Sequence, residues 1–241
     1  MTFDLRKNSI LENLIFFASL MLMLLALFVG VVSYKVERIT GEYIKIRPDG
    51  IYTRVAALQR EGRTVLLIGM AHVARKGFYD DVINRIPTTS LVLEEGVSDR
   101  DHLLPDGLDY THLGLSTLDD QKNFMGKLRA SRHTVNADID VNQLKPANIE
   151  FLRAIGRYLK GDQKPLENNP SIDSDFIKSF FDDVLDRRNE HLLNVLSSQD
   201  GTYNSFTIAW GALHLASIEE ELKTQGYRIE STENLKLFSF F

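Results

Sequence analysis

The hydrophobic residues of this chain gather in short continuous runs, and stretches with helical spacing separate most of these runs. Residues 64–68, 90–93 and 206–210 form such runs, which are typical of strands buried on both faces of a sheet. Strands that alternate with helices in this way favour parallel pairing. The pattern therefore predicts an α/β fold whose central, largely parallel sheet is flanked by helices.

Weaker patterns complete the expected domain. Shorter strands are expected at residues 51–56, 134–137 and 227–230, and helices at residues 78–86, 121–132, 147–159, 176–196 and 218–223. Ser171 or Ser174 is the expected N-cap of the long helix at 176–196. The mainly helical stretch at about 145–198 is long enough to be an insertion that covers one end of the sheet.

The N-terminal region differs from the rest of the chain because residues 13–34 contain no charged side chain. A helix needs about 20 apolar residues to cross a bilayer core, so residues 1–38 are predicted to form a single transmembrane anchor and residues 39–241 the α/β domain. A buried core helix and a cleaved signal peptide are the alternatives. The first would normally have a polar face, and the second would have a shorter apolar region.

Charged residues beside the apolar segment give little information on its orientation. Arg6 and Lys7 precede the segment, and Lys35 and Arg38 follow it, so the positive charges are balanced. The N-terminal tail is too short to hold a domain. We therefore expect a signal-anchor with the main domain outside the cytoplasm, which is the periplasmic side in a bacterium.

The composition excludes several classes of site and partner. The chain has no cysteine, which excludes disulfides, thiolate nucleophiles and cysteine-ligated zinc. Its formal net charge of −5 comes without a basic stripe, so nucleic acid is not expected as a partner. The motifs of zincins, serine hydrolases and nucleotide-binding loops are absent from the sequence.

Two of the apolar runs end in the same motif, Gly-x-x-His. Gly69 and His72 follow the run at 64–68, and Gly211 and His214 follow the run at 206–210. Glycine permits a sharp turn and a close approach of the backbone at the end of each strand. If the strands are parallel, both imidazoles lie at one edge of the sheet, where α/β proteins form their sites.

Acidic residues follow the other strands at the same expected edge. Glu94 and Glu95 follow residues 90–93, and Asp138 follows residues 134–137. Two neutral imidazoles and a carboxylate can bind a divalent transition metal, whose bound water is activated, while a nearby carboxylate acts as general base. The alternative is that the histidines are core or helix-capping residues and that the glutamates begin a solvated loop.

The helix at 176–196 carries the charged sequence Asp-Arg-Arg-Asn-Glu at residues 186–190. A solvated helix face would explain this run. If one arginine points inward instead, its guanidinium could hold a substrate carboxylate or orient a carboxylate of the site.

Five segments, in order along the chain, resemble those of the TraB/PrgY/GumN/Tiki family. They are the Gly-x-x-His segment at 67–73, the strand ending in Glu94 at 91–94, the aspartate segment at 137–140, the Arg-Asn helix at 186–189, and the closing Gly-x-x-His block at 209–215. The resemblance spans about residues 50–230. The lack of a basic residue after Asp138 places the chain closest to the GumN/Tiki side.

The resemblance implies a fold related to the erythromycin-esterase-like group. For the Tiki branch it implies a membrane-tethered protease that depends on manganese or cobalt. It assigns His72, Glu94 and His214 to the metal and the catalysis, with support from the residues Arg188, Asn189 and Asp138. Because Glu95 follows Glu94, either carboxylate could face the site.

We therefore expect an anchored metal-dependent hydrolase that acts on a peptide or protein substrate. One alternative is a non-catalytic module that binds a peptide, a metal or haem and sequesters a signalling ligand. Another is a membrane-tethered scaffold with structural histidines.

Overall fold

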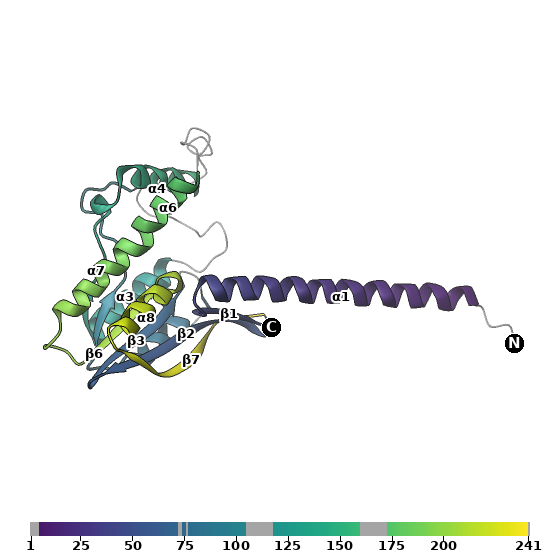
Figure 1. Ribbon diagram of the computed structural model, residues 1–241, viewed down its shortest axis with the longest axis horizontal. Helices are drawn as coiled ribbons and strands as arrows, with labels where there is room; N and C mark the ends of the chain where they lie inside the picture. The colour runs from purple at the N-terminus through teal and green to yellow at the C-terminus, as the bar shows by residue number, and fades with distance from the viewer. Residues whose placement is uncertain (1–4, 72–73, 76, 105–117, 160–172, 241) are drawn as a thin grey trace.

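A computed structural model describes residues 5–71, 74–75, 77–104, 118–159 and 173–240 of the chain (Figure 1). One sheet forms its centre, with the strands β1 (Ile44–Arg47), β2 (Gly50–Arg60), β3 (Arg63–Met70), β4 (Leu91–Glu94), β5 (His133–Asn136), β6 (Ser205–Gly211) and β7 (Arg228–Ser239). The helices are α1 (Leu5–Ile39), α2 (Phe78–Arg85), α3 (Leu118–Ser131), η2 (Val141–Gln143), α4 (Pro146–Leu159), α6 (Ser174–Phe181), η3 (Asp182–Asp186), α7 (Arg187–Ser198) and α8 (Ala212–Thr224).

Four of the strands form a parallel block in the order β3-β6-β4-β5. The apolar runs predicted from the sequence are β3, β4 and β6; β4 and β6 are mainly buried, and every residue of β3 is buried or partly buried. Because β6 lies between β3 and β4 and all three run in the same direction, their carboxyl ends meet at one edge. This part of the sequence prediction is confirmed.

The rest of the sheet is antiparallel, so the prediction of a largely parallel sheet is wrong. β2 pairs antiparallel with β1, β3 and β7. The residues at 51–53 of β2 pair with both β1 and β7, and those at 55–59 pair with both β3 and β7, so β7 runs along the edge of β2 opposite β1 and β3. Most of β7 is solvent-exposed, and it extends well beyond the strand expected at residues 227–230.

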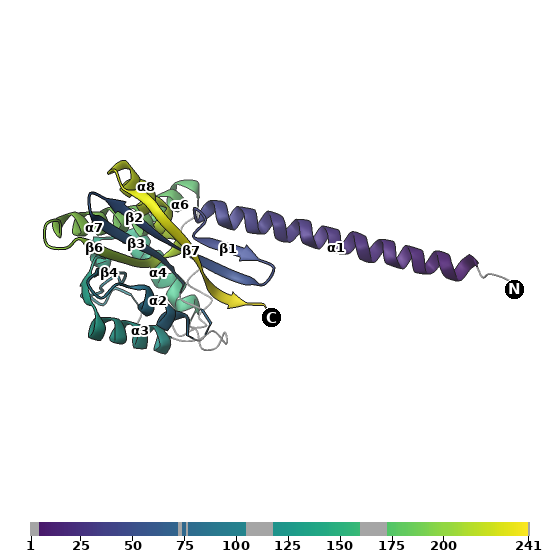
Figure 2. The ribbon, with the colours of Figure 1, turned by 90° about the horizontal axis from the view of Figure 1, so that it is seen from below.

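Helices cover both faces of the sheet and enclose two separate apolar cores. On one face, Leu192 and Leu196 of α7 and Leu215 and Ile218 of α8 pack with Trp210 of the sheet. On the other face, α2 and α3 pack against the sheet through residues that include Phe78, Val82, Phe124 and Leu128. Figure 2 shows these two helical layers on opposite sides of the strands. The domain is therefore a mixed α/β sandwich of three layers.

The helix expected at 176–196 is interrupted by one wide turn. α6 and α7 are joined through η3, a π-helical segment that spans Asp182–Asp186. The N-cap of α6 is Asp173, whose carboxylate accepts a hydrogen bond from the amide of Phe176 at 2.8 Å. The prediction that Ser174 is the cap is therefore wrong, and Ser171 lies outside the described residues.

Helix α1 extends away from the sheet (Figures 1 and 2). Its portion Ser19–Ile39 has a mean hydropathy of 2.1, is not buried by the domain, and is long enough to cross a membrane, while its end contacts β1 through the ion pair of Glu37 with Arg47. A tight turn at Gly41 and Glu42, both with positive φ, joins α1 to β1. The Tyr43 hydroxyl then donates to Glu219 of α8 at 2.8 Å, which fastens this junction to the domain.

Candidate functional site

The carboxyl ends of the parallel strands bring together polar side chains from four segments. Glu95 directly follows β4, Asp138 lies two residues after β5, and His214 lies in the first turn of α8, directly after β6. Arg188 and Asn189 reach the same edge from the start of α7. We refer to Glu95, Asp138, Arg188, Asn189 and His214 as the rim cluster.

The guanidinium of Arg188 is the centre of the rim cluster. Its Nε and Nη2 donate to the two oxygens of Asp138 at 2.9 and 2.7 Å, and Nη2 also donates to Glu95 Oε1 at 2.9 Å. Its Nη1 donates to the carbonyl of Val184 at 3.3 Å and to His214 Nε2 at 3.2 Å. These contacts use every N–H group of the guanidinium. Arg188 therefore orients carboxylates of the site and has no donor left for a substrate.

The neighbourhood of Arg188 explains how this charge is accommodated. Its guanidinium carbon lies 5.4 Å from the centroid of the Trp210 ring, within the range of a cation–π interaction. The acceptor carbonyl of Val184 belongs to the π-helical segment η3, and such segments often occur at functional sites. Trp210 was not assigned a role from the sequence, although its place beside Gly211 in the second motif could have suggested one.

His214 is buried and accepts the contact from Arg188 as a neutral imidazole. Since the guanidinium can only donate, His214 Nε2 carries the lone pair and Nδ1 carries the proton. That proton is donated to Asn189 Oδ1, with a distance of 2.7 Å between the heavy atoms. Burial and the charge of Arg188 lower the pKa of His214 to about 4. The imidazole is thus uncharged at neutral pH and is fixed in one tautomer.

Glu95 and Glu94 point to opposite faces of the sheet. Glu95 Oε2 accepts a hydrogen bond from the amide of Gly211 at 2.6 Å, and Glu95 Oε1 lies 3.8 Å from His214 Nε2. Glu94 instead pairs with Arg129 of α3, whose Nη2 lies 2.7 Å from Glu94 Oε2. The carboxylate that the structure brings together with Arg188 and His214 is therefore that of Glu95.

The side chain of Asp138 is completely buried. Its Oδ2 accepts from the amide of Gly96 at 3.0 Å, and its Oδ1 accepts from the amide of Ile139 at 2.9 Å. Asn136 supports this loop by donating from Nδ2 to the carbonyl of Gly96 at 2.9 Å. Asn136 was also not assigned from the sequence, and the only indication was its position at the end of the short strand β5.

The two motif glycines have different surroundings. A Cβ atom at Gly69 would overlap with Thr53 Oγ1 of the neighbouring strand, so this glycine is required by packing between β3 and β2. At Gly211, a Cβ atom would lie 3.5 Å from Glu95 Oε2 and 3.6 Å from the His214 ring, which are ordinary contact distances. Gly211 therefore adjoins the functional groups, whereas Gly69 serves the close approach of two strands.

The described side chains do not provide a ligand set for the divalent metal that the resemblance implies. Within the described ranges, no group of three or more His, Asp and Glu side chains is arranged to hold a metal ion. Arg188 lies between the carboxylates and the imidazole. Its N–H groups contact both oxygens of Asp138, one oxygen of Glu95 and His214 Nε2. His72, a predicted metal ligand, lies outside the described residues.

Comparison with known proteins gives one match. The model of the TraB/PrgY/gumN family matches residues 109–231, about half of the chain. This region contains Asp138, Arg188, Asn189 and His214. The match identifies the family as a whole and does not select the GumN/Tiki side. No curated protein and no solved structure matches the chain.

Proposed function

The chain belongs to the TraB/PrgY/gumN family, and we propose from this premise that it is a membrane-anchored hydrolase that cleaves peptide bonds at the rim cluster. Helix α1 would hold the domain at the membrane surface, with the domain on the extracytoplasmic side. Glu95 would be the catalytic base.

The observation that carries this proposal is the accessibility of Glu95 within an otherwise closed cluster. The side chain of Glu95 is 22% exposed, whereas those of Asp138, His214 and Arg188 are 0%, 5% and 11% exposed. A general base must reach the water or substrate that it deprotonates. Among these groups, Glu95 combines ionisable oxygens with the greatest access to solvent.

The proposed reaction uses Glu95 for both proton transfers. The Glu95 carboxylate takes a proton from water, and the oxygen of that water forms a bond with the carbonyl carbon of the substrate. The C–N bond then breaks as the protonated Glu95 returns its proton to the leaving nitrogen. The products are a carboxylic acid and an amine, and no oxidant or other co-reactant is needed. General catalysis of this type contributes about 10²- to 10⁴-fold to a rate.

The remaining members of the rim cluster act as positioning residues. Asp138 and His214 hold the guanidinium of Arg188 from two sides, and Arg188 together with the Gly211 amide holds Glu95. A carboxylate fixed by such contacts does not have to reorganise during the reaction. Because the carboxylates and the imidazole of the rim cluster already accept hydrogen bonds from Arg188, we assign this chemistry to the side chains alone and include no metal-dependent step.

A second candidate is a peptide-binding module without turnover. It is favoured by the hydrogen bonding of Arg188 and His214, since each N–H group of Arg188 and both nitrogens of His214 contact protein atoms. A network of this kind can form a rigid surface against which a ligand binds.

The two candidates can be distinguished with the detergent-solubilised full chain and a mixture of peptides of known sequence. Mass spectrometry would detect new peptide termini, and equilibrium dialysis would detect retained intact peptides. The hydrolase proposal requires new termini that form with the wild-type chain and not with Glu95→Gln. Retention of intact peptides with no new termini would support the binding module instead.

A further inference from the structure

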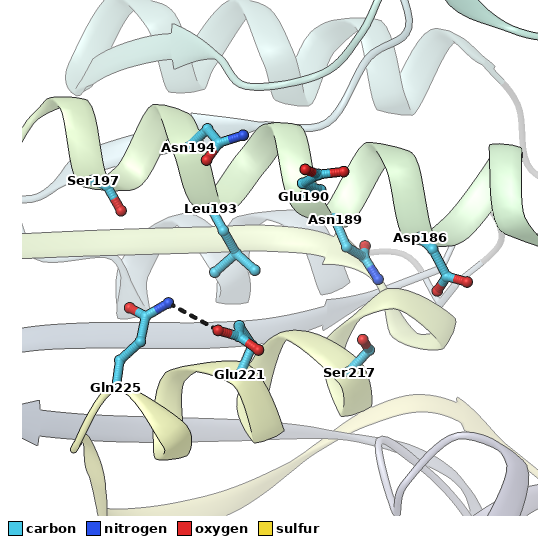
Figure 3. Close-up of a pocket in the computed structure, with 9 residues that line it drawn as sticks. All are labelled: Asp186, Asn189, Glu190, Leu193, Asn194, Ser197, Ser217, Glu221 and Gln225. Atoms are coloured by element: carbon cyan, nitrogen blue, oxygen red, sulfur yellow. Dashed lines mark hydrogen bonds between the residues drawn. The ribbon is translucent and has the colours of Figure 1, made fainter.

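A groove lies between α7 and α8, next to the rim cluster (Figure 3). Its volume is about 300 Å³, and Asn189 is the member of the rim cluster that lines it. In Figure 3, Asp186 of η3 and Leu193 and Ser197 of α7 extend toward α8, while Glu221 extends from α8 toward α7. The groove thus begins at the residue that holds His214 and continues along both helices.

The lining of the groove carries negative charge and no positive charge. Asp186, Glu190 and Glu221 contribute carboxylates, and the other lining residues are neutral. Within the described residues none of these three carboxylates is part of an ion pair, and the contact of Glu221 in the groove is with the neutral amide of Gln225 at 3.4 Å. A cationic group that enters the groove would therefore meet unneutralised carboxylates.

Asn189 supplies a second and independent indication of a ligand. It is only 4% exposed, and its Nδ2 is a buried donor with no partner in the described part of the chain. Figure 3 shows its amide directed to the space between α7 and α8. A buried donor without an acceptor is destabilising, so such groups generally find a partner.

The rim cluster fixes which end of the Asn189 amide faces the groove. Arg188 donates to His214 Nε2, which places the proton of His214 on Nδ1 and requires an oxygen of Asn189 as its acceptor. The amide therefore presents its NH₂ group to the groove. The missing partner must be a hydrogen-bond acceptor, such as a peptide carbonyl.

We propose that the groove between α7 and α8 binds a peptide segment that carries lysine or arginine. The main-chain carbonyl of the segment accepts from Asn189 Nδ2, and its cationic side chain lies among Asp186, Glu190 and Glu221. Leu193 contacts the aliphatic part of that side chain. This inference extends the proposed function and rests on it, because it takes peptide hydrolysis as the reaction at the neighbouring rim cluster. A protonated polyamine satisfies the carboxylates but offers no acceptor to Asn189, which favours the peptide.

The test is an equilibrium binding experiment with the full chain in micelles of a non-ionic detergent. The probe is an amidated Gly-Lys-Lys-Gly peptide with a neutral fluorophore on its N-terminal amine, and the same labelled peptide with norleucine in place of both lysines is its neutral counterpart. Mass spectrometry of the recovered probe shows whether it was cleaved. Loss of binding and loss of hydrolysis are therefore separate results, and only the first concerns the groove.

We expect the lysine peptide to bind at least about tenfold more tightly than the norleucine peptide, because three carboxylates contribute modest amounts each. The triple variant Asp186→Asn/Glu190→Gln/Glu221→Gln should lose this difference. The control Glu220→Gln, which alters a carboxylate paired with Lys223 beside the groove, should keep it within about twofold. Tryptophan fluorescence checks that each variant is folded, and the single variant Glu221→Gln replaces the triple variant if that one unfolds.

Three results would overturn the proposal. Equal binding of the lysine and norleucine peptides would show that the carboxylates do not select a cation. If the triple variant, or Glu221→Gln used in its place, binds the lysine peptide as tightly as the wild-type chain does, the cationic side chain binds outside the groove. Spermidine and the unlabelled lysine peptide can each be used to displace the labelled lysine peptide. If spermidine is effective at the same concentration as the unlabelled peptide, a hydrogen-bond acceptor for Asn189 does not contribute to binding.

Discussion

Arg188 and Asp138 form a two-point contact in which Nε and Nη2 of the guanidinium meet the two carboxylate oxygens at 2.9 and 2.7 Å. The two residues come from different layers of the fold, since Arg188 lies on α7 and Asp138 follows an edge strand of the sheet. The contact therefore fixes the helical segment against the carboxyl ends of the strands. Because Arg188 also contacts Glu95 and His214, the position of each group depends on this pair.

Replacement of Arg188 by lysine should destabilise the fold. An ammonium group cannot make the paired contacts of a guanidinium, and the buried Asp138 would lose at least one partner. We expect Arg188→Lys to lower the free energy of unfolding by about 2 to 3 kcal/mol. The matched control Arg187→Lys alters a half-exposed neighbour and should cost less than about 1 kcal/mol.

These two variants can be compared by denaturant unfolding followed through Trp210, the only tryptophan of the chain. Its ring lies 5.4 Å from the guanidinium carbon of Arg188, so its emission reports directly on the site. Equal destabilisation by the two variants would contradict the central position of Arg188.

The neutral state of His214 predicts a defined dependence of stability on pH. The pKa of His214 is about 4 in the folded state and about 6.5 in the unfolded state, so the unfolded chain binds the proton more readily as the pH falls. The folded state therefore loses stability as the pH falls from about 6.5 to about 4, and this contribution is fully present only above about pH 6.5. Between pH 7 and pH 5 the loss should be about 2 kcal/mol.

The variant His214→Gln isolates this contribution from those of other titrating groups. Its free energy of unfolding should change less than that of the wild-type chain between pH 7 and pH 5, by about the same 2 kcal/mol. Denaturant titrations at both pH values give the comparison. Identical changes in the two proteins would mean that His214 is not held neutral in the fold.

The two motif glycines should respond differently to alanine. Gly69→Ala forces a methyl group against Thr53 Oγ1 and should destabilise the chain by about 1 to 3 kcal/mol. The added variant Thr53→Ala should partly restore stability by removing that oxygen. Gly211→Ala should change stability by less than about 1 kcal/mol, because its methyl group meets Glu95 and His214 at ordinary contact distances. Thermal unfolding of the three variants checks the order, and a Gly211→Ala variant less stable than Gly69→Ala would contradict it.

Removal of divalent metal should leave the fold intact. Since the N–H groups of Arg188 engage the carboxylates and the imidazole of the rim cluster, we expect a chelator to shift the midpoint of thermal unfolding by less than about 1 °C. Elemental analysis of the purified chain should show less than one bound transition metal per protein. A stoichiometric metal that is lost together with stability would instead indicate a site completed by residues outside the described part.

The parallel core could be predicted from the sequence because its signal is local. Strands β3, β4 and β6 are continuous apolar runs, and burial on both faces accounts for their composition. The antiparallel part could not be predicted in this way. β7 is an exposed edge strand rich in polar residues, and its pairing of Ser239 with Gly50 joins the two ends of the domain. Such pairing depends on the tertiary structure and leaves no local pattern.

The sequence predicted which residues belong to the candidate site better than it predicted how they are arranged. Asp138, Arg188, Asn189 and His214 were selected from the sequence, and the structure places them together. The choice between Glu94 and Glu95 depends on which face of the sheet α7 and α8 cover. Successive residues alternate between the faces of a strand, so a single residue decides the environment of each carboxylate. Nothing in the sequence near residue 94 specifies where these two distant helices pack.

The most direct test compares Glu95→Gln with Glu94→Gln in peptide hydrolysis by the full chain. Each variant removes one negative charge from adjacent positions, but only Glu95 contacts Arg188 and Gly211. We predict that Glu95→Gln lowers kcat/KM by at least about 100-fold without unfolding the protein, while Glu94→Gln keeps it within about threefold of the wild-type value. A folded Glu95→Gln variant with undiminished kcat/KM, or an equal loss in both variants, would contradict the assignment of Glu95 as the base.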